Sequence, residues 1–288
     1  MSNSNRKKSL RVQGSWAAPP RRSTLPKHES QRPTDVPSTH KSASISWAGK
    51  QTDTVVNKSL SFQNVPPQDL KEPPKLKYLR ENGEHILGST DRGCSKVILN
   101  ANFIPSNDAD WMFETLLNEI QWKQQKNLKY GPDYKEPRLT EWFSNHPYHY
   151  SGVEQAFNPH WHPLLTALCD RINQEYRLHF NAVLANCYRD GHDSVDWHTD
   201  SEPALGNCPP IASLSFGDTR NFDLREIPAT VANGDFTYSQ QFRIPLSHGT
   251  LLLMLGATQH DWQHRVPKEY HDRKPRINLT FRTMHPSR

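Results

Sequence analysis

Hydrophobic residues recur at helical spacing in two stretches of the chain. Between residues 106 and 120 the apolar positions are Ala109, Met112, Phe113, Leu116, Leu117 and Ile120. Between residues 161 and 176 they are Trp161, Leu164, Leu165, Leu168, Ile172 and Tyr176. Steps of three and four residues place such side chains on one face of a helix, so the pattern predicts two amphipathic helices.

Short runs of strand composition surround the second helix and follow it to the end of the chain. One run, EPRLTEWF, lies between the helices, and six follow them: NAVLANCYR, PPIASLSFG, TRNFDLRE, QFRIPLS, GTLLLMLG and RINLTFRT. Strands grouped after helices, without regular alternation, favour a mainly β fold with flanking helices on one side of a largely antiparallel double sheet. A β-sandwich or jelly roll satisfies this pattern and can hold a pocket between its sheets.

Composition divides the chain into a tail and a body. Residues 1–60 carry eleven Lys and Arg against three acids, while the whole chain of 288 residues is +5, so the remainder is net negative. The same segment is rich in serine and proline and has too little apolar surface to offset the entropy lost on folding. We expect residues 1–90 to form a disordered basic tail, serving either for solubility or as a loose tether for nucleic acid, and residues 91–288 to form one domain.

The sequence also indicates where in the cell the protein is expected. Its start lacks the apolar core of a secretory signal, and its longest aliphatic run, LLLML, is far shorter than a membrane span. The four cysteines form no C-x-x-C pair and are typical of reduced thiols. We expect a soluble monomer of the nucleus and cytoplasm that does not bind a membrane.

The last predicted strand carries two arginines on one face. With side chains alternating along a strand, Arg276, Asn278 and Arg282 point the same way, opposite to an apolar face. A strand with so apolar a back is expected at the centre of a sheet, where an unpaired charge costs several kcal/mol (~3–5). A small dicarboxylate ligand would satisfy both guanidinium groups.

A His-x-Asp pair precedes this strand. His198 and Asp200 point the same way in an extended segment, and His264 lies twelve residues before Arg276. Two histidines and one carboxylate make up the facial triad that holds non-haem Fe(II) with open positions for substrate and O₂. The other closely spaced pair, His160 and His162, sits at a predicted helix start between prolines, and we assign it to capping and surface roles.

The segments NCYRDGHDSVDWHTDSEP, HGTLLLMLGATQHDWQHRVPK and PRINLTFR, in this order, resemble the AlkB-type Fe(II)/2-oxoglutarate dioxygenases over residues 92–285. The resemblance implies a double-stranded β-helix, with His198, Asp200 and His264 as iron ligands and 2-oxoglutarate and O₂ as co-substrates. It assigns Arg276 to the distal carboxylate of 2-oxoglutarate and Arg282 to its chelating end.

Further positions correspond to co-substrate residues of that family. Asn186 and Tyr188 match its Asn-x-Tyr, and Asn278 lies between the two arginines on the same strand face. The aromatic positions Trp122, Tyr148 and Tyr150 match residues lining the pocket, although ordinary core packing accounts for them equally well. Leu184 shares the strand face of Asn186; we expect it to form an apolar wall of the base pocket and to be hydroxylated during turnover without substrate.

The activity implied is oxidative demethylation of 1-methyladenine and 3-methylcytosine in single-stranded DNA and RNA, releasing formaldehyde. Tyr134 and Arg138 match a segment bordering the pocket of the damaged base, and Glu202 is placed to accept a hydrogen bond from its exocyclic amine. A strand-separating protein would be a fitting partner for such an enzyme. Two other readings remain: a hydroxylase of a protein or small molecule with the same cofactors, and a non-enzymatic jelly-roll module that binds nucleic acid.

Overall fold

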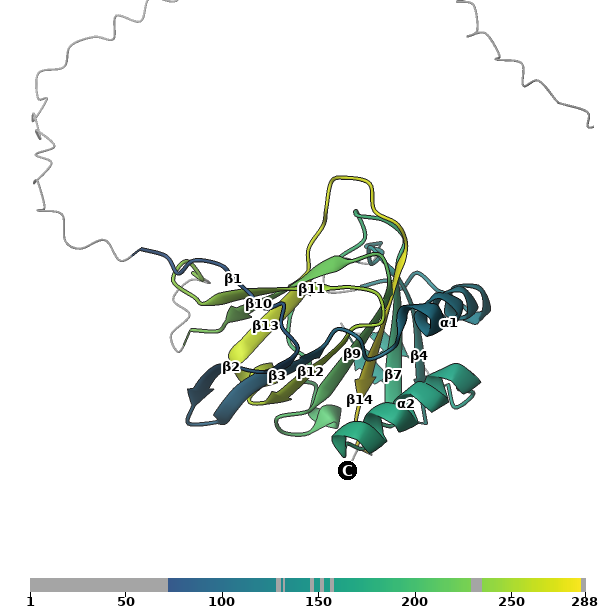
Figure 1. Cartoon of the computed structure of the whole chain (residues 1–288), viewed down its shortest axis with the longest axis horizontal. Coiled ribbons are helices and arrows are strands. Elements are labelled where there is room, and N and C mark those ends of the chain that lie inside the picture. The colour runs from purple at the N-terminus through teal and green to yellow at the C-terminus, as the bar shows by residue number, and fades with distance from the viewer. Residues whose placement is uncertain are drawn as a thin grey trace, which may run out of the picture. The chain divides into compact units, whose positions relative to one another are not determined.

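The computed structural model describes residues 72–127, 131, 133–145, 148–150, 153–155, 158–228 and 235–285. Most of the predicted tail lies outside these residues. The described part of the chain forms two larger sheets, a small hairpin and two long helices (Figure 1).

The larger sheet is antiparallel throughout and has seven strands. In spatial order these are β2 (Gly83–Thr90), β3 (Gly93–Asn100), β12 (Leu251–Gly256), β9 (Ile211–Gly217), β14 (Arg276–Arg282), β7 (Ala182–Tyr188) and β4 (Leu139–Ser144). The second sheet has five, in the order β1 (Lys77–Tyr78), β11 (Gln241–Leu246), β10 (Arg220–Glu226), β13 (Trp262–Val266) and β8 (Val195–His198). A separate hairpin pairs β5 (Tyr148–Tyr150) with β6 (Val153–Gln155).

The eight strands from β7 to β14 are shared between the two larger sheets. β7, β9, β12 and β14 lie in the larger sheet, and β8, β10, β11 and β13 lie in the second. This alternation is that of a double-stranded β-helix, so the predicted jelly roll is confirmed. Consecutive strands thereby place the end of β8, the middle of β13 and one face of β14 around the same interior.

Both predicted helices are present and pack on the larger sheet. α1 (Ser106–Glu119) and α2 (Pro163–Tyr176) lie beside β4, β7 and β14, as Figure 1 shows. The nitrogen Nδ1 of His162 caps α2 by accepting from Leu164 N at 3.1 Å, which confirms the capping role expected there. In the described part of the chain, no helix is both long and apolar enough to cross a membrane.

Strand alternation separates two apolar layers. On β12, Leu251 and Leu253 are buried with the helices, while Leu252 and Met254 are buried in a cluster between the two sheets. The apolar residues of β14 belong to the cluster that contains the helices, not to the cluster between the sheets: Ile277, Leu279 and Phe281. The polar face of β14 is therefore directed toward the interior of the jelly roll.

The predicted boundary between tail and domain at residue 90 is wrong. The whole of β2 pairs with β3, Leu87 is buried between the sheets, and β1 adds to β11 in parallel. The composition of this segment concealed its structure because both strands lie at sheet edges, where most side chains face water; Ile86, for example, is 66 % exposed.

The two edge strands β1 and β2 predict how truncation of the chain affects its stability. A chain that begins at residue 91 loses β2 and the buried Leu87, whose burial alone is worth about 2 kcal/mol, and should show a lower free energy of unfolding in denaturant. A chain that begins at residue 72 keeps both edge strands and serves as the control. Equal stability of the two truncated chains would mean that β1 and β2 contribute nothing to the fold.

Candidate active site

The three predicted metal ligands meet at one point inside the jelly roll. His198 ends β8, Asp200 follows two residues later, and His264 lies on β13 directly opposite His198. One ligand atom from each of the three residues lies within 4.8 Å of the others. Antiparallel pairing of β8 and β13 thus brings together His198 and His264, which are 66 positions apart.

The histidines are held as neutral ligands. Nδ1 of His198 donates to the carbonyl of Asp196 at 2.7 Å, which leaves Nε2 with its lone pair. His198 keeps some surface exposed to the cleft described below, yet removal from water lowers its pKa, and burial lowers the pKa of His264 to about 3. Within the described residues, Nδ1 of His264 and Oδ1 of Asp200 are buried without a hydrogen-bond partner, as metal-ligating atoms would be.

Asp200 is kept charged by a buried arginine. Burial acts to raise the pKa of Asp200, but Arg282, His264 and His198 together outweigh it and lower this pKa to about 2. Nη2 of Arg282 donates to Oδ2 at 2.9 Å, and the backbone N–H of Asp200 donates to Oε1 of Gln259 at 2.9 Å. Arg282 was expected at the chelating end of 2-oxoglutarate; the structure shows it bonded to the carboxylate of a metal ligand, and its contact with 2-oxoglutarate stays a prediction.

Arg276 presents an open cation to the interior. Its Nη2 donates to Ser215 Oγ at 2.9 Å, and its Nε and Nη1 are buried with no hydrogen-bond partner in the described part of the chain. Burial lowers its pKa to about 10, which still leaves it charged at neutral pH. A buried cation with two unused donors requires an anion, and a carboxylate of 2-oxoglutarate fits this need.

Polar side chains line the inner cavity beside Arg276 and the triad. Nδ2 of Asn278 donates to Ser213 Oγ at 2.8 Å, and Oδ1 of Asn186 accepts from Nε of Arg138 at 3.0 Å. They line a small cavity of about 40 Å³ together with Leu184, Tyr188, Arg276, Arg282 and the three triad residues. Leu184 therefore lines the inner cavity and is not among the residues of the outer cleft described next. Its hydroxylation stays a prediction that peptide mass spectrometry would test.

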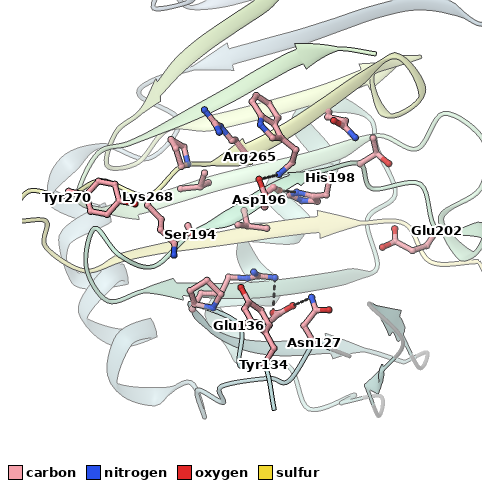
Figure 2. A pocket seen from close by; sticks show the side chains of 18 residues that line it. Asn127, Tyr134, Glu136, Ser194, Asp196, His198, Glu202, Arg265, Lys268 and Tyr270 are labelled. Atoms are coloured by element: carbon pink, nitrogen blue, oxygen red, sulfur yellow. Dashed lines mark hydrogen bonds and ion pairs between the residues drawn. The ribbon is translucent and has the colours of Figure 1, made fainter. Parts of the chain in front are cut away.

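A larger cleft opens on the outer side of the triad. Its volume is about 850 Å³, and Tyr134, Arg138 and Glu202 all line it, as expected (Figure 2). The cleft shares Arg138 and His198 with the inner cavity, along with Val195 and Val266. A group held in the cleft can therefore reach the metal site without entering the space that faces Arg276.

Of the three aromatic residues expected to line the co-substrate pocket, only Trp122 has a described side chain. Trp122 lines neither cavity: its ring packs against the helical core, and Nε1 donates to Leu117 O at 3.1 Å. These contacts are the ordinary packing expected as the alternative for Trp122, and its co-substrate role stays a prediction. The side chains of Tyr148 and Tyr150 lie outside the described residues.

Several contributing residues were not predicted. Glu136 accepts from Arg138 at 3.0 Å and from Asn127 at 3.0 Å, which fixes one wall of the cleft. On the other wall, the guanidinium groups of Arg225 and Arg265 stack on the ring of Trp197. Their Cζ atoms lie 4.3 and 4.4 Å from the centroid of this ring. Only Glu136 had a local signal, its place two residues before Arg138; the other contacts depend on strand pairing.

The triad predicts the metal dependence of the protein. His264→Ala removes one of three ligands, and because losing even an outer partner of a ligand costs 10- to 100-fold in affinity, we expect Fe(II) or Mn(II) binding to weaken by more than about 100-fold in calorimetric titration. His260→Ala, four residues earlier, serves as the control, since His260 bonds Asn207 instead. Unchanged affinity in a folded His264→Ala protein would contradict the assignment.

Comparisons with known proteins agree with this geometry. Residues 96–282 match the family model of the 2OG-Fe(II) oxygenase superfamily. The chain is 42 % identical to alpha-ketoglutarate-dependent dioxygenase alkB homolog 3 of Homo sapiens, over 98 % of this chain and 96 % of that protein. It is 31 % identical to DNA oxidative demethylase ALKBH2 of Homo sapiens, over 74 % of this chain and 85 % of that protein. The chain therefore belongs to the 2OG-Fe(II) oxygenase superfamily and, within it, to the alkB-homologue dioxygenases.

Proposed function

We propose that this dioxygenase demethylates 1-methyladenine and 3-methylcytosine in single-stranded DNA and RNA. The observation that carries the proposal is the cleft, which reaches the triad at His198 and has a carboxylate, Glu202, at one end. Its volume of about 850 Å³ lies within the range of small-molecule sites. Family membership and the complete triad exclude the reading as a non-enzymatic module.

The residues of the inner cavity hold the cofactors. His198, Asp200 and His264 would ligate Fe(II), and Arg276 would bind a carboxylate of 2-oxoglutarate, which orients the co-substrate toward the metal. When bound, these groups supply the oxidation: one oxygen atom of O₂ enters the N-methyl group, the other enters succinate, and CO₂ is released. The hydroxymethyl group on nitrogen then leaves as formaldehyde, and the base regains its unmethylated form.

The outer cleft supplies recognition of the base. Both 1-methyladenine and 3-methylcytosine carry a positive charge and an exocyclic amine next to the methylated nitrogen. The carboxylate of Glu202 can attract the charge and accept from the amine. Arg138, held by Glu136 and Asn186, forms the boundary between the base and the co-substrate.

A base must leave a helical stack to enter such a cleft, and this costs least in a single strand. The name of one relative, DNA oxidative demethylase, supports nucleic acid as the substrate class. We extend the proposal to a monomer acting in the nucleus and cytoplasm, assisted by a strand-separating protein. Cell imaging of the tagged full chain tests the location, and co-purification with helicases tests the partner.

The role of Arg276 predicts a selective kinetic defect. Arg276→Ala removes the charged N–H groups that would donate to a carboxylate of 2-oxoglutarate. The KM for 2-oxoglutarate should therefore rise by about 10- to 100-fold, the effect of one or two charged hydrogen bonds. Lys274→Ala removes an exposed positive charge two residues away and should leave this KM unchanged. A similar KM in both variants would move the carboxylate site elsewhere.

The proposed substrates are tested by formaldehyde release. The protein, with Fe(II), 2-oxoglutarate and O₂, should release formaldehyde from single-stranded oligonucleotides containing either base. Glu202→Ala should slow this by about 10- to 100-fold, while succinate formation without nucleic acid continues. Glu84→Ala, which removes an exposed carboxylate on β2, is the control.

Two outcomes would contradict parts of the proposed function. Absence of formaldehyde from both oligonucleotides, with succinate still formed, would favour hydroxylation of a protein or small molecule. Full activity of Glu202→Ala would keep the reaction but remove Glu202 from base recognition.

A further inference from the structure

An exposed tyrosine stands at one end of the cleft. Tyr270 lies in the segment between β13 and β14, lines the cleft and is 83 % exposed. Figure 2 shows Tyr270 and Lys268 at one end of the cleft and Glu202 at the other, with His198 between them. So exposed an aromatic ring at the rim of a binding site has no role in the core and is a candidate contact for a ligand.

The segment that carries Tyr270 is held in place from one side by a neighbouring loop. The backbone N–H of Glu269 donates to Gly191 O at 2.8 Å, and Nη2 of Arg220 donates to both Asp193 O and Pro267 O, at 2.9 and 2.6 Å. A Cβ atom on Gly191 would lie 2.3 Å from the carbonyl oxygen of Glu269, so the two backbones touch.

The side chain of Glu269 adds a second set of anchors. It accepts from Asn221 at 3.3 Å and from Arg273, and it lies 3.3 Å from His271. Beyond it, the backbone N–H of Lys274 donates to Asp218 at 3.0 Å. Tyr270 is therefore presented on a segment fixed on both sides, and its exposure is a property of the fold.

The surroundings of Tyr270 suit a nucleotide. Its ring lies 6.3 Å from that of His192 and perpendicular to it, which orients the tyrosine from one side. Lys268, two residues earlier, is exposed and makes no ion pair within the described residues. Proteins that bind single strands combine such elements: aromatic rings stack on bases and nearby cations contact the phosphates.

We infer that Tyr270 stacks on an unmodified base next to the methylated one and that Lys268 contacts the phosphate between or beside them. The inference rests on the proposed function, because it adds a neighbouring nucleotide to the same substrate. With the methylated base at His198 and Glu202, the strand leaves the cleft past Tyr270. The enzyme then recognises a short stretch of strand instead of an isolated base, with little preference for the sequence of the neighbour, since every base can stack.

The test compares two oligonucleotides that share one central 1-methyladenine. In the first, the flanking nucleotides carry bases; in the second, they are abasic but keep the same phosphates. For the unaltered protein, KM should be about 5- to 10-fold higher for the abasic oligonucleotide, the lower part of the range for one lost base–aromatic stack.

Variants assign this difference to Tyr270. Tyr270→Ala should raise the KM for the first oligonucleotide by the same factor and leave the KM for the abasic one unchanged, while Tyr270→Phe should behave like the unaltered protein. Trp111→Ala removes a half-exposed aromatic ring on α1 and should alter neither KM. Lys268→Ala should weaken binding of both oligonucleotides and lower the dependence of affinity on salt by about one phosphate contact.

The results separate the inference from the proposed function. If the unaltered protein releases formaldehyde from both oligonucleotides and Tyr270→Ala changes neither KM, the stacking role is overturned and the demethylase function stands. If Tyr270→Ala raises both values equally, the tyrosine acts on the cleft and not on a neighbouring base, which also overturns the inference. Absence of formaldehyde from the unaltered protein would overturn the proposed function itself.

Discussion

The burial of two guanidinium groups on one face of β14 is the constraint on which the site depends. β14 is paired on both sides, with β7 and β9, and its other face is covered by the helical core. Arg276 and Arg282 are consequently 1 % and 3 % exposed. A buried charge without a partner costs several kcal/mol (~3–5), so this strand is stable at the centre of the sheet only with anions opposite it.

The fold supplies one of these anions and leaves the other to the co-substrate. Asp200 is bonded to Arg282 at 2.9 Å, and this contact also fixes the carboxylate beside the two histidines. The positive charge of Arg282 keeps Asp200 ionised, which makes it a better ligand for a divalent cation. Arg276 makes no ion pair with an acid among the described residues, and its open donors suit a carboxylate of the co-substrate. Metal binding and co-substrate binding therefore follow from the same pair of arginines.

Periodicity in the sequence predicted the parts of the fold that repeat a pattern over many residues. The helical stripes of α1 and α2 and the two faces of β14 followed from spacing. The jelly roll followed from the order of the elements and from the resemblance, and the triad followed from residue type combined with the arginine face. The edge strand β2 was not predicted because few of its side chains are buried. β8 and β13 have only four and five residues, too few for an alternating pattern to reveal them. The role of Trp122 stayed open because an aromatic residue fits a core and a pocket equally well.

The remaining contacts depend on which segments the fold brings together. Gln259 reaches the backbone of Asp200 across 59 positions, and Arg138 reaches Asn186 across 48; neither has a local sequence signal. Arg138 is the more informative of the two, since it lines both cavities and also bonds Glu136 on the wall of the cleft. The structure thus connects substrate recognition to the co-substrate cavity through one buried side chain, while the chemistry stays on the rigid strands and the specificity on the loops around them.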